Sequence, residues 1–314
     1  REPTRRTGLT NDSDRLAVAR GDLVVTAGGQ SLEREALLEV MAEVAEGVGP
    51  WRTMVEAVAM RTTGLGGDSE VHFVSQGVQG GGELGPRRGV PIALIAHEAP
   101  EAVLPLLEAQ MRSAVPGAHD GRFVQAVPGL PVDGLAARDA ALLDRIADGV
   151  HGLGAVLRSR MDQAALRRLV ARGMVQVAGL TPSDASHVLG YLSTWDTEAA
   201  RMACALFGRR RTGAGERLAQ TPEQMAQIVV DQLTHQTNVT LLQAALTEDV
   251  LDEAYATHAL MQRGLSGAPG LLHVSTGLNV PVVGLGASAR AYYPAVGAAL
   301  SCNMLLPEDG GVAN

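Results

Sequence analysis

Residues 280–289 of the chain read Val-Pro-Val-Val-Gly-Leu-Gly-Ala-Ser-Ala, an apolar run that leads into a turn of small residues. The run has the length and composition of a buried strand. Pro294 follows shortly and suits the first turn of a helix over residues 294–300. A strand, a tight turn and a helix in succession are typical of α/β layers. This stretch therefore predicts an α/β fold.

The same alternation of strand and turn marks the first third of the chain. Apolar and polar residues alternate loosely over 16–25, as they do in a strand, and the Gly-Gly pair at 28–29 marks a turn after this run. The apolar residues of 32–45 have the spacing of a helix. Short apolar runs at 71–74 and 90–95, bracketed by glycine-rich turns, predict buried strands. Residues 271–274 form one more apolar run near the end of the chain.

The middle of the chain is expected to be mostly helical. Two helix starts are well marked, because Thr181-Pro182 and Thr221-Pro222 each place an N-cap threonine before a proline at the first helical position. These helices, at about 135–260, are expected to pack on a lobe built from residues 51–104 and 271–314. The segments of helical length and period are 137–157, 162–172, 183–207 and 222–246.

Composition excludes several functions. The 314 residues are 46% apolar and 19% charged, which is typical of a globular protein. All 26 basic residues are arginines, so a P-loop lysine, a Schiff-base lysine and a Ser-Lys pair are excluded. A net charge of −8 argues against binding to nucleic acid. The two cysteines, Cys204 and Cys302, have no partner at metal-ligand spacing.

The sequence also predicts no association with a membrane. It contains no apolar stretch of spanning length, and its first residues lack the apolar core of a signal peptide. We therefore expect a soluble, cytoplasmic protein.

The first candidate binding segment is the turn over residues 62–69, Thr-Thr-Gly-Leu-Gly-Gly-Asp-Ser, which precedes the expected strand at 71–74. Its glycines, Gly64, Gly66 and Gly67, could present backbone N–H groups to an anion, with Ser69 adding a hydroxyl. Asp68 could hold a metal ion in the absence of lysine. The alternative is a plain glycine turn in which Asp68 caps a neighbouring segment.

The second candidate segment is the turn at Gly284, Gly286, Ala287 and Ser288. Small residues let a flat ligand approach the backbone, and a following helix N-terminus favours anions. The pattern matches neither the full dinucleotide fingerprint nor the nucleophile elbow of serine hydrolases. Elsewhere, His97-Glu98 after an apolar run is a weaker candidate, and His187 is expected to lie on a helix face.

Three motifs in order resemble the hydantoinase/oxoprolinase family, of the hydantoinase A type. They are Trp-Arg-Thr-Met-Val-Glu-Ala-Val at 51–58, Gly-Leu-Gly-Gly-Asp-Ser at 64–69 and Gly-Pro-Arg-Arg at 85–88. Later stretches at 180–190, at 282–287 and at 306–308 are similar to the end of the same family. Residues 1–50 look like a fragment of its N-terminal lobe, and residues 51–314 like an ATPase lobe with a helical insertion at about 135–260.

The resemblance implies the fold of the actin, sugar kinase and heat-shock ATPase superfamily, a ribonuclease H-like lobe with a mixed sheet. It also implies ATP-dependent opening of a cyclic amide such as a hydantoin or 5-oxoproline, with Mg²⁺ and a second subunit of the hydantoinase B type or a homo-oligomer. In that scheme both glycine turns face one nucleotide cleft. Gly64, Gly66, Gly67, Ser69, Gly284, Gly286, Ala287 and Ser288 bind the nucleotide, and Asp68 is catalytic.

One family feature is missing. The Asp-x-Gly-Gly-Thr phosphate turns, which hold ATP and its metal, do not occur in the sequence. Two alternatives therefore stay open, a non-catalytic subunit that binds nucleotide or a partner, and a subunit of an ATP-dependent ketone carboxylase.

Overall fold

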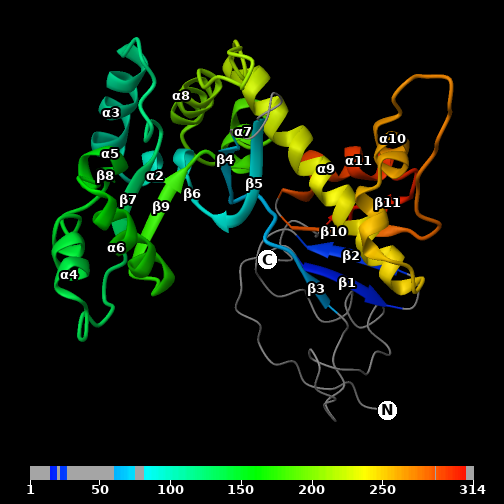
Figure 1. Ribbon diagram of the computed structural model, residues 1–314, viewed down its shortest axis with the longest axis horizontal. Helices are drawn as coiled ribbons and strands as arrows, with labels where there is room; N and C mark the ends of the chain where they lie inside the picture. The colour runs from blue at the N-terminus through cyan, green and yellow to red at the C-terminus, as the bar shows by residue number, and fades with distance from the viewer. Residues whose placement is uncertain (1–14, 20–21, 27–59, 75–80, 287, 309–314) are drawn as a thin grey trace. The chain divides into compact units, whose positions relative to one another are not determined.

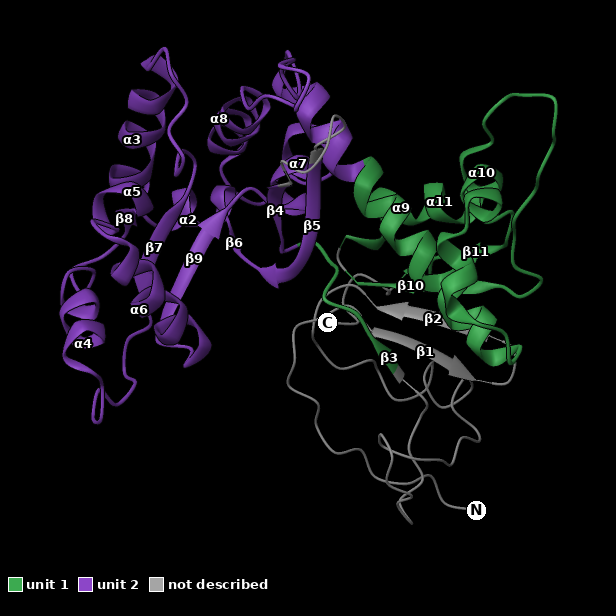
Figure 2. Ribbon diagram, viewed as in Figure 1, with its two compact units in different colours: residues 1–67, 231–314 green, residues 68–230 purple. Residues whose placement is uncertain are grey.

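The computed structural model describes residues 15–19, 22–26, 60–74, 81–286 and 288–308 (Figure 1). The chain divides into two compact units, which we call unit 1 and unit 2 (Figure 2). Unit 1 combines residues 1–67 with 231–314, and unit 2 is the continuous segment 68–230. Helices and a mixed sheet are both present, so the expected α/β class is confirmed. The boundary at residue 50 that the sequence suggested lies outside the described residues.

Unit 1 contains a five-stranded mixed sheet with the order β11-β10-β2-β1-β3. β1 runs antiparallel to both of its neighbours, whereas β10 is parallel to β2 and to β11. Residues 16–25, expected as one strand, are a hairpin of two. The strands are β1 (Arg15–Ala19), β2 (Asp22–Thr26), β3 (Met60–Thr62), β10 (Val282–Leu285) and β11 (Met304–Leu305).

A helix joins the two parallel strands at the end of the chain. α11 contacts both β10 and β11, and it buries Tyr292, Tyr293 and Val296. It begins five residues before the proline that was expected to open it, so Pro294 lies inside the helix. The helices of unit 1 are the C-terminal part of α9 (Pro222–Glu248), the 3₁₀ helix η1 (Glu253–Thr257), α10 (Ala259–Ser266) and α11 (Ala289–Ala299).

Unit 2 has sheets of its own. β4 and β5 form an antiparallel pair with a bulge between Ser69 and Val71, and a separate four-stranded sheet has the order β6-β9-β7-β8. Its strands β8 and β9 fall within the region that the sequence suggested to be a helical insertion. The strands are β4 (Ser69–Val74), β5 (Gly81–Arg88), β6 (Val90–Pro91), β7 (Phe123–Ala126), β8 (His151–Gly152) and β9 (Val175–Gly179).

The helices of unit 2 complete its core. One buried cluster joins β7 and β9 to α4 and α6 through Val124, Leu142, Leu169 and Val175. Arg168 of α6 also donates two hydrogen bonds to the buried carboxylate of Asp139 in α4. The helices are α2 (Ile92–Glu98), α3 (Pro100–Arg112), α4 (Ala137–Asp144), α5 (Leu153–Val156), α6 (Arg160–Ala171), α7 (Pro182–Val188), α8 (Thr197–Gly208) and the start of α9.

The apolar run at 90–95 is mostly helical, so the expectation of a strand there was wrong. Only Val90 and Pro91 pair as β6, after which α2 begins at Ile92. A short apolar run buried on several sides has no periodicity that separates strand from helix. The run at 271–274 forms no strand either, and Leu271 is fully exposed.

Two long helices expected from periodicity are interrupted at glycines with positive φ. Gly149 (φ 140°) lies between α4 and β8, where one helix over 137–157 was expected. Gly190 (φ 76°) follows α7, where one helix over 183–207 was expected. Such backbone angles do not continue a helix, and glycine adopts them without strain, although α4 itself already ends at Asp144.

Two sequence expectations lie outside the described residues, namely the helix at 32–45 and the motif at 51–58. None of the described helices is both long enough and apolar enough to cross a membrane.

Candidate functional site

The two glycine turns leave the same edge of the unit 1 sheet. Leu285 at the end of β10 pairs with Thr26, Thr26 pairs with Arg15, and Arg15 pairs with Thr62 at the end of β3. β3 and β10 also run in the same direction, since β3 and β2 are both antiparallel to β1 and β10 is parallel to β2. The turn after Thr62 and the turn after Leu285 therefore start from one row, about 14 Å apart at three strand spacings.

This edge includes a reversal of strand order. From β10 the chain passes through α11 to β11 on one side, whereas from β2 the next described strand of this sheet is β3, on the other side. The described strands that follow these two adjacent parallel strands in the chain therefore lie on opposite sides of the pair. In open α/β sheets ligands bind outside the strand ends at such a switch point.

The residues of the second turn differ in what they can offer a ligand. Gly286 has φ 114°, a backbone angle that L side chains rarely adopt, and Ser288 is the N-cap of α11 with no capping hydrogen bond from its side chain. Ala287 lies outside the described residues. Gly284 is buried, and a Cβ atom there would collide with the ring of Tyr293 and stand 2.8 Å from Cδ2 of Leu306. Helix packing therefore accounts for Gly284 without a ligand.

The first turn crosses the boundary between the units. Gly64, Gly66 and Gly67 belong to unit 1, whereas Asp68 and Ser69 belong to unit 2. The Asp68 carboxylate accepts hydrogen bonds from Nε of Arg88, at 2.5 Å, and from its Nη2. The Asp68 backbone carbonyl accepts a further bond from the N–H of Gly89, and Ser69 is buried as the first residue of β4.

The described residues bear on the magnesium ion that the resemblance implies. Among them, no three His, Cys, Asp or Glu side chains lie close enough together to hold a metal ion. Asp68, the residue implied as catalytic, has its carboxylate in an ion pair with Arg88. Any magnesium ion held by these residues would therefore depend on ligands from the nucleotide and from water as well.

The Thr181-Pro182 motif has a structural role. Thr181 and Asp184 form a capping box at the start of α7, and the other oxygen of Asp184 accepts a 2.7 Å hydrogen bond from the N–H of Ala93 in α2. Asp184 is fully buried, and this burial raises the pKa of its carboxyl group to about 6 although the hydrogen bonds oppose the shift. One side chain thus caps two helices.

The histidine candidates are also accounted for within unit 2. Nδ1 of His187 lies 2.7 Å from the carbonyl oxygen of Ser183, and its Nε2 accepts from the N–H of Trp195 at 3.1 Å. These partners assign the proton to Nδ1 and make the ring a buried structural link that stacks on Trp195. His97 and Glu98 are exposed at the end of α2 rather than at a strand end.

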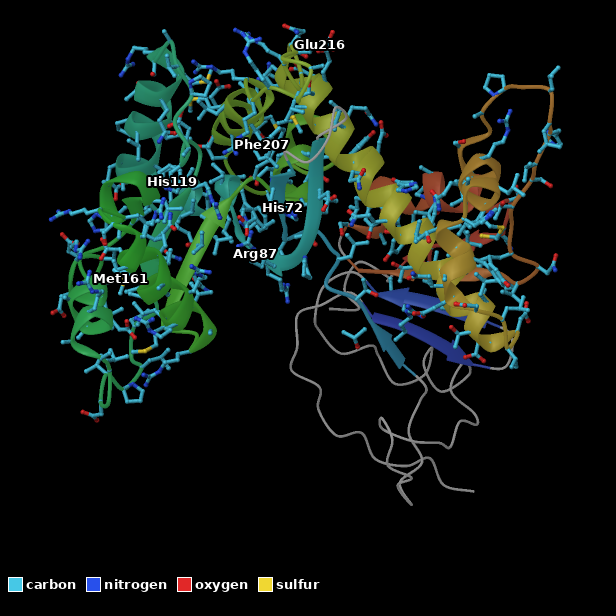
Figure 3. The ribbon with its side chains drawn as sticks, viewed as in Figure 1. His72, Arg87, His119, Met161, Phe207 and Glu216 are labelled. Atoms are coloured by element: carbon cyan, nitrogen blue, oxygen red, sulfur yellow. The ribbon has the colours of Figure 1, made fainter. Side chains whose placement is uncertain are left out.

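The sequence reasoning missed a polar cavity of about 240 Å³ in unit 2. Its charged lining comes from four separate segments: Glu70 of β4, Arg87 of β5, Arg122 beside β7 and Arg210 after α8, with Asp120 near Arg122. Figure 3 labels Phe207, His72 and Arg87, which also line it. The available signal was Glu70, an acidic residue inside an apolar strand, because a buried charge needs partners.

Glu70 organises this cavity. Its carboxylate is buried and pairs with Nη2 of Arg122 through one oxygen and with Nε of Arg87, at 3.2 Å, through the other. Arg210 lies with its guanidinium carbon 4.6 Å from the centre of the Phe207 ring. Burial lowers the pKa of Arg210, and the positive charge of Arg122 lowers it further, while Asp120 opposes this.

No protein family, no curated protein and no solved structure matches this chain. The geometry alone therefore defines its class, an α/β protein with a mixed five-stranded sheet in one unit and an arginine-lined cavity in the other.

Proposed function

We propose that this chain is one subunit of an ATP-dependent hydrolase that opens a cyclic amide, of the hydantoin or 5-oxoproline type. Its part in that reaction is to bind the nucleotide at the carboxyl edge of the unit 1 sheet. The proposal rests on one observation, namely that β3 and β10 end in the same row of the sheet. Both glycine turns therefore begin at one edge, which includes a switch point.

The turn after β10 is the more specific half of this site. The N-terminus of α11 carries a partial positive charge, which favours a phosphate group near Ser288, although the N–H groups of Ala289 and Ala291 already donate to the carbonyls of Gly286 and Ser288. Gly286 adopts φ 114°, an angle that L side chains rarely adopt, and as a glycine it places no side-chain atoms at that position. Bound ATP would supply the free energy for opening a stable ring amide. Gly64, Gly66 and Gly67 form the opposite part of the edge.

The proposal is tested by adding a negative charge where the phosphate would lie. Ser288→Asp keeps a residue that caps helices well, so α11 is expected to remain folded. The new carboxylate repels phosphate, and we expect the affinity for ATP in equilibrium dialysis to fall about tenfold or more. Ser159→Asp makes the same change at the N-cap of α6 and is the matched control. Equal ATP binding by both variants contradicts the proposal.

A second candidate function is a non-catalytic nucleotide-binding subunit. It is favoured by the lack of a metal-holding cluster among the described side chains and by the ion pair between Asp68 and Arg88. The two functions differ in turnover, measured as ATP-dependent ring opening of hydantoin and of 5-oxoproline. If the chain opens the ring and Asp68→Asn abolishes this turnover, the chain is catalytic. If the chain binds ATP without turnover, the non-catalytic function is supported.

A further inference from the structure

The guanidinium group of Arg210 is arranged to receive an anion. Its guanidinium carbon lies over the ring of Phe207, 4.6 Å from the ring centre, and no hydrogen bond of its side-chain N–H donors is seen among the described residues. Within the part of the chain that the structure describes, no carboxylate lies within ion-pair distance of Arg210. Arg122, by contrast, is held in place by the buried carboxylate of Glu70.

The cavity around Arg210 carries an excess of positive charge. Three guanidinium groups, those of Arg87, Arg122 and Arg210, line it together with the carboxylates of Glu70 and Asp120. Asp120 also accepts a 2.7 Å hydrogen bond from the N–H of Gly117, so part of its charge is already engaged. A ligand with one negative charge would balance the lining.

The size and walls of the cavity limit what that ligand can be. At about 240 Å³ it is smaller than the roughly 300–1,000 Å³ of pockets for drug-sized ligands, so a nucleoside triphosphate is too large. Phe73, Leu180 and Phe207 supply apolar walls. Nδ1 of His72 also lines this region, and it is buried without a hydrogen-bond partner among the described residues.

We propose that this cavity binds a small organic monocarboxylate, with the carboxylate on Arg210 and Arg122 and the apolar body against Phe207. The planar fork of an arginine matches a carboxylate through two parallel hydrogen bonds. Glu70 acts as a positioning residue, since its two ion pairs fix Arg87 and Arg122 at the wall. This site belongs to unit 2 alone and does not depend on nucleotide binding by unit 1.

The test is calorimetric titration of the full chain with benzoate, whose flat ring suits the apolar walls. Benzamide is the neutral comparison of similar shape, and inorganic phosphate is the comparison anion. We expect saturable binding of benzoate and much weaker binding of both others. Arg210→Gln should weaken benzoate binding about ten- to hundred-fold, the cost of a lost charge-assisted hydrogen bond.

Arg211→Gln is the matched control, because it removes the same charge from the next residue. Arg211 is exposed and donates to the carbonyl of Gly215, and neither residue is among those that line the cavity. We expect it to bind benzoate as the parent does. Should Arg210→Gln not fold, Arg210→Lys keeps the charge but loses the planar fork, and it should still bind more weakly than the Arg211 variant.

Four outcomes overturn the proposal. Equal binding by the Arg210 and Arg211 variants would place the ligand elsewhere, and equal binding of benzamide would remove the role of charge. Tighter, Arg210-dependent binding of phosphate would make this a phosphate site. Failure of benzoate to saturate the folded parent protein would mean that no small carboxylate site exists here.

Discussion

A single buried carboxylate, that of Asp184, connects the starts of two helices. It accepts from Ala93 at the beginning of α2 and from the N–H and hydroxyl groups of Thr181 at the beginning of α7, each oxygen lying 2.7–2.9 Å from its donors. The sequence pattern at 181–184 predicted the local capping box correctly. It contained no sign of the bond to Ala93, because that partner lies 91 residues away.

Asp184 should make stability depend on pH in an unusual direction. Its pKa is raised to about 6 by burial, so its contribution is complete below the unfolded value near 3.8 and is lost as the pH rises through 6. Asp184→Asn does not titrate and keeps an oxygen for Ala93. We expect its stability deficit relative to the parent to be larger at pH 4 than at pH 7 and to shrink by roughly 2 kcal/mol over that range.

Urea unfolding of both proteins at several pH values between 4 and 7 measures this difference. The comparison of parent and variant cancels the other groups that titrate in that range, His119 among them, whose pKa is lowered mainly by burial. A deficit that stays constant from pH 4 to pH 7 would contradict the assignment.

Gly284 illustrates why the sequence alone could not distinguish glycines that contact a ligand from glycines that are required by the packing of neighbouring side chains. It lies in β10, two residues before Gly286, and its missing side chain is required by Tyr293 and Leu306. We expect Gly284→Ala to lower the free energy of unfolding by about 1–3 kcal/mol through overpacking. Tyr293→Leu in the same chain should relieve part of that cost, which a double-mutant cycle of urea denaturation measures. Strictly additive effects would argue against this contact.

At the scale of elements, sequence periodicity identified the helices but not their breaks. α7 ends where Gly190 adopts φ 76°, and the N–H groups of Gly190 and Tyr191 bond back to the carbonyls of His187 and Ser186. A glycine two residues after Val188 was visible in the sequence, but a helical period continued beyond it. Positive φ is a backbone property that periodicity does not report.

Gly190→Ala should therefore test backbone strain with little interference from packing. No atom outside its neighbours lies within 4 Å of a Cβ placed there, so the expected loss of about 1 kcal/mol comes from the left-handed angle. Gly154→Ala in α5 is the control, since its φ is ordinary and a new Cβ would make a 3.7 Å contact with Cβ of His119. Thermal unfolding should rank the Gly154 variant at or above the parent. The reverse order would be inconsistent with backbone strain at Gly190.

At the scale of the whole molecule, the candidate sites depend on pairings that no local pattern encodes. The common row of β3 and β10 follows from the registers of β1 and β2 between them, and the cavity of unit 2 collects arginines from 87, 122 and 210. The α/β class was predictable because strand and helix periods are local. The assignment of strands to separate sheets was not.

The core of unit 2 offers a test at this scale. Leu142 is fully buried in the cluster that joins α4 and α6 to β7 and β9. Leu142→Ala should cost about 2–5 kcal/mol, seen as faster hydrogen exchange of the amides in β7 and β9. Leu130→Ala, at an exposed site, is the control and should leave exchange unchanged. Unchanged protection of β7 and β9 in the Leu142 variant would refute the cluster as a cooperative core.

The insertion of unit 2 into unit 1 sets an order of events during synthesis. β2 emerges from the ribosome early, but its parallel partner β10 follows only after all of residues 68–230 have been made. β2 ends at Thr26 and β10 begins at Val282, so at about 5–20 residues per second the delay is on the order of 10–50 s. For this time the edge of β2 lacks its final neighbour. The nascent chain should therefore bind chaperones until β10 appears.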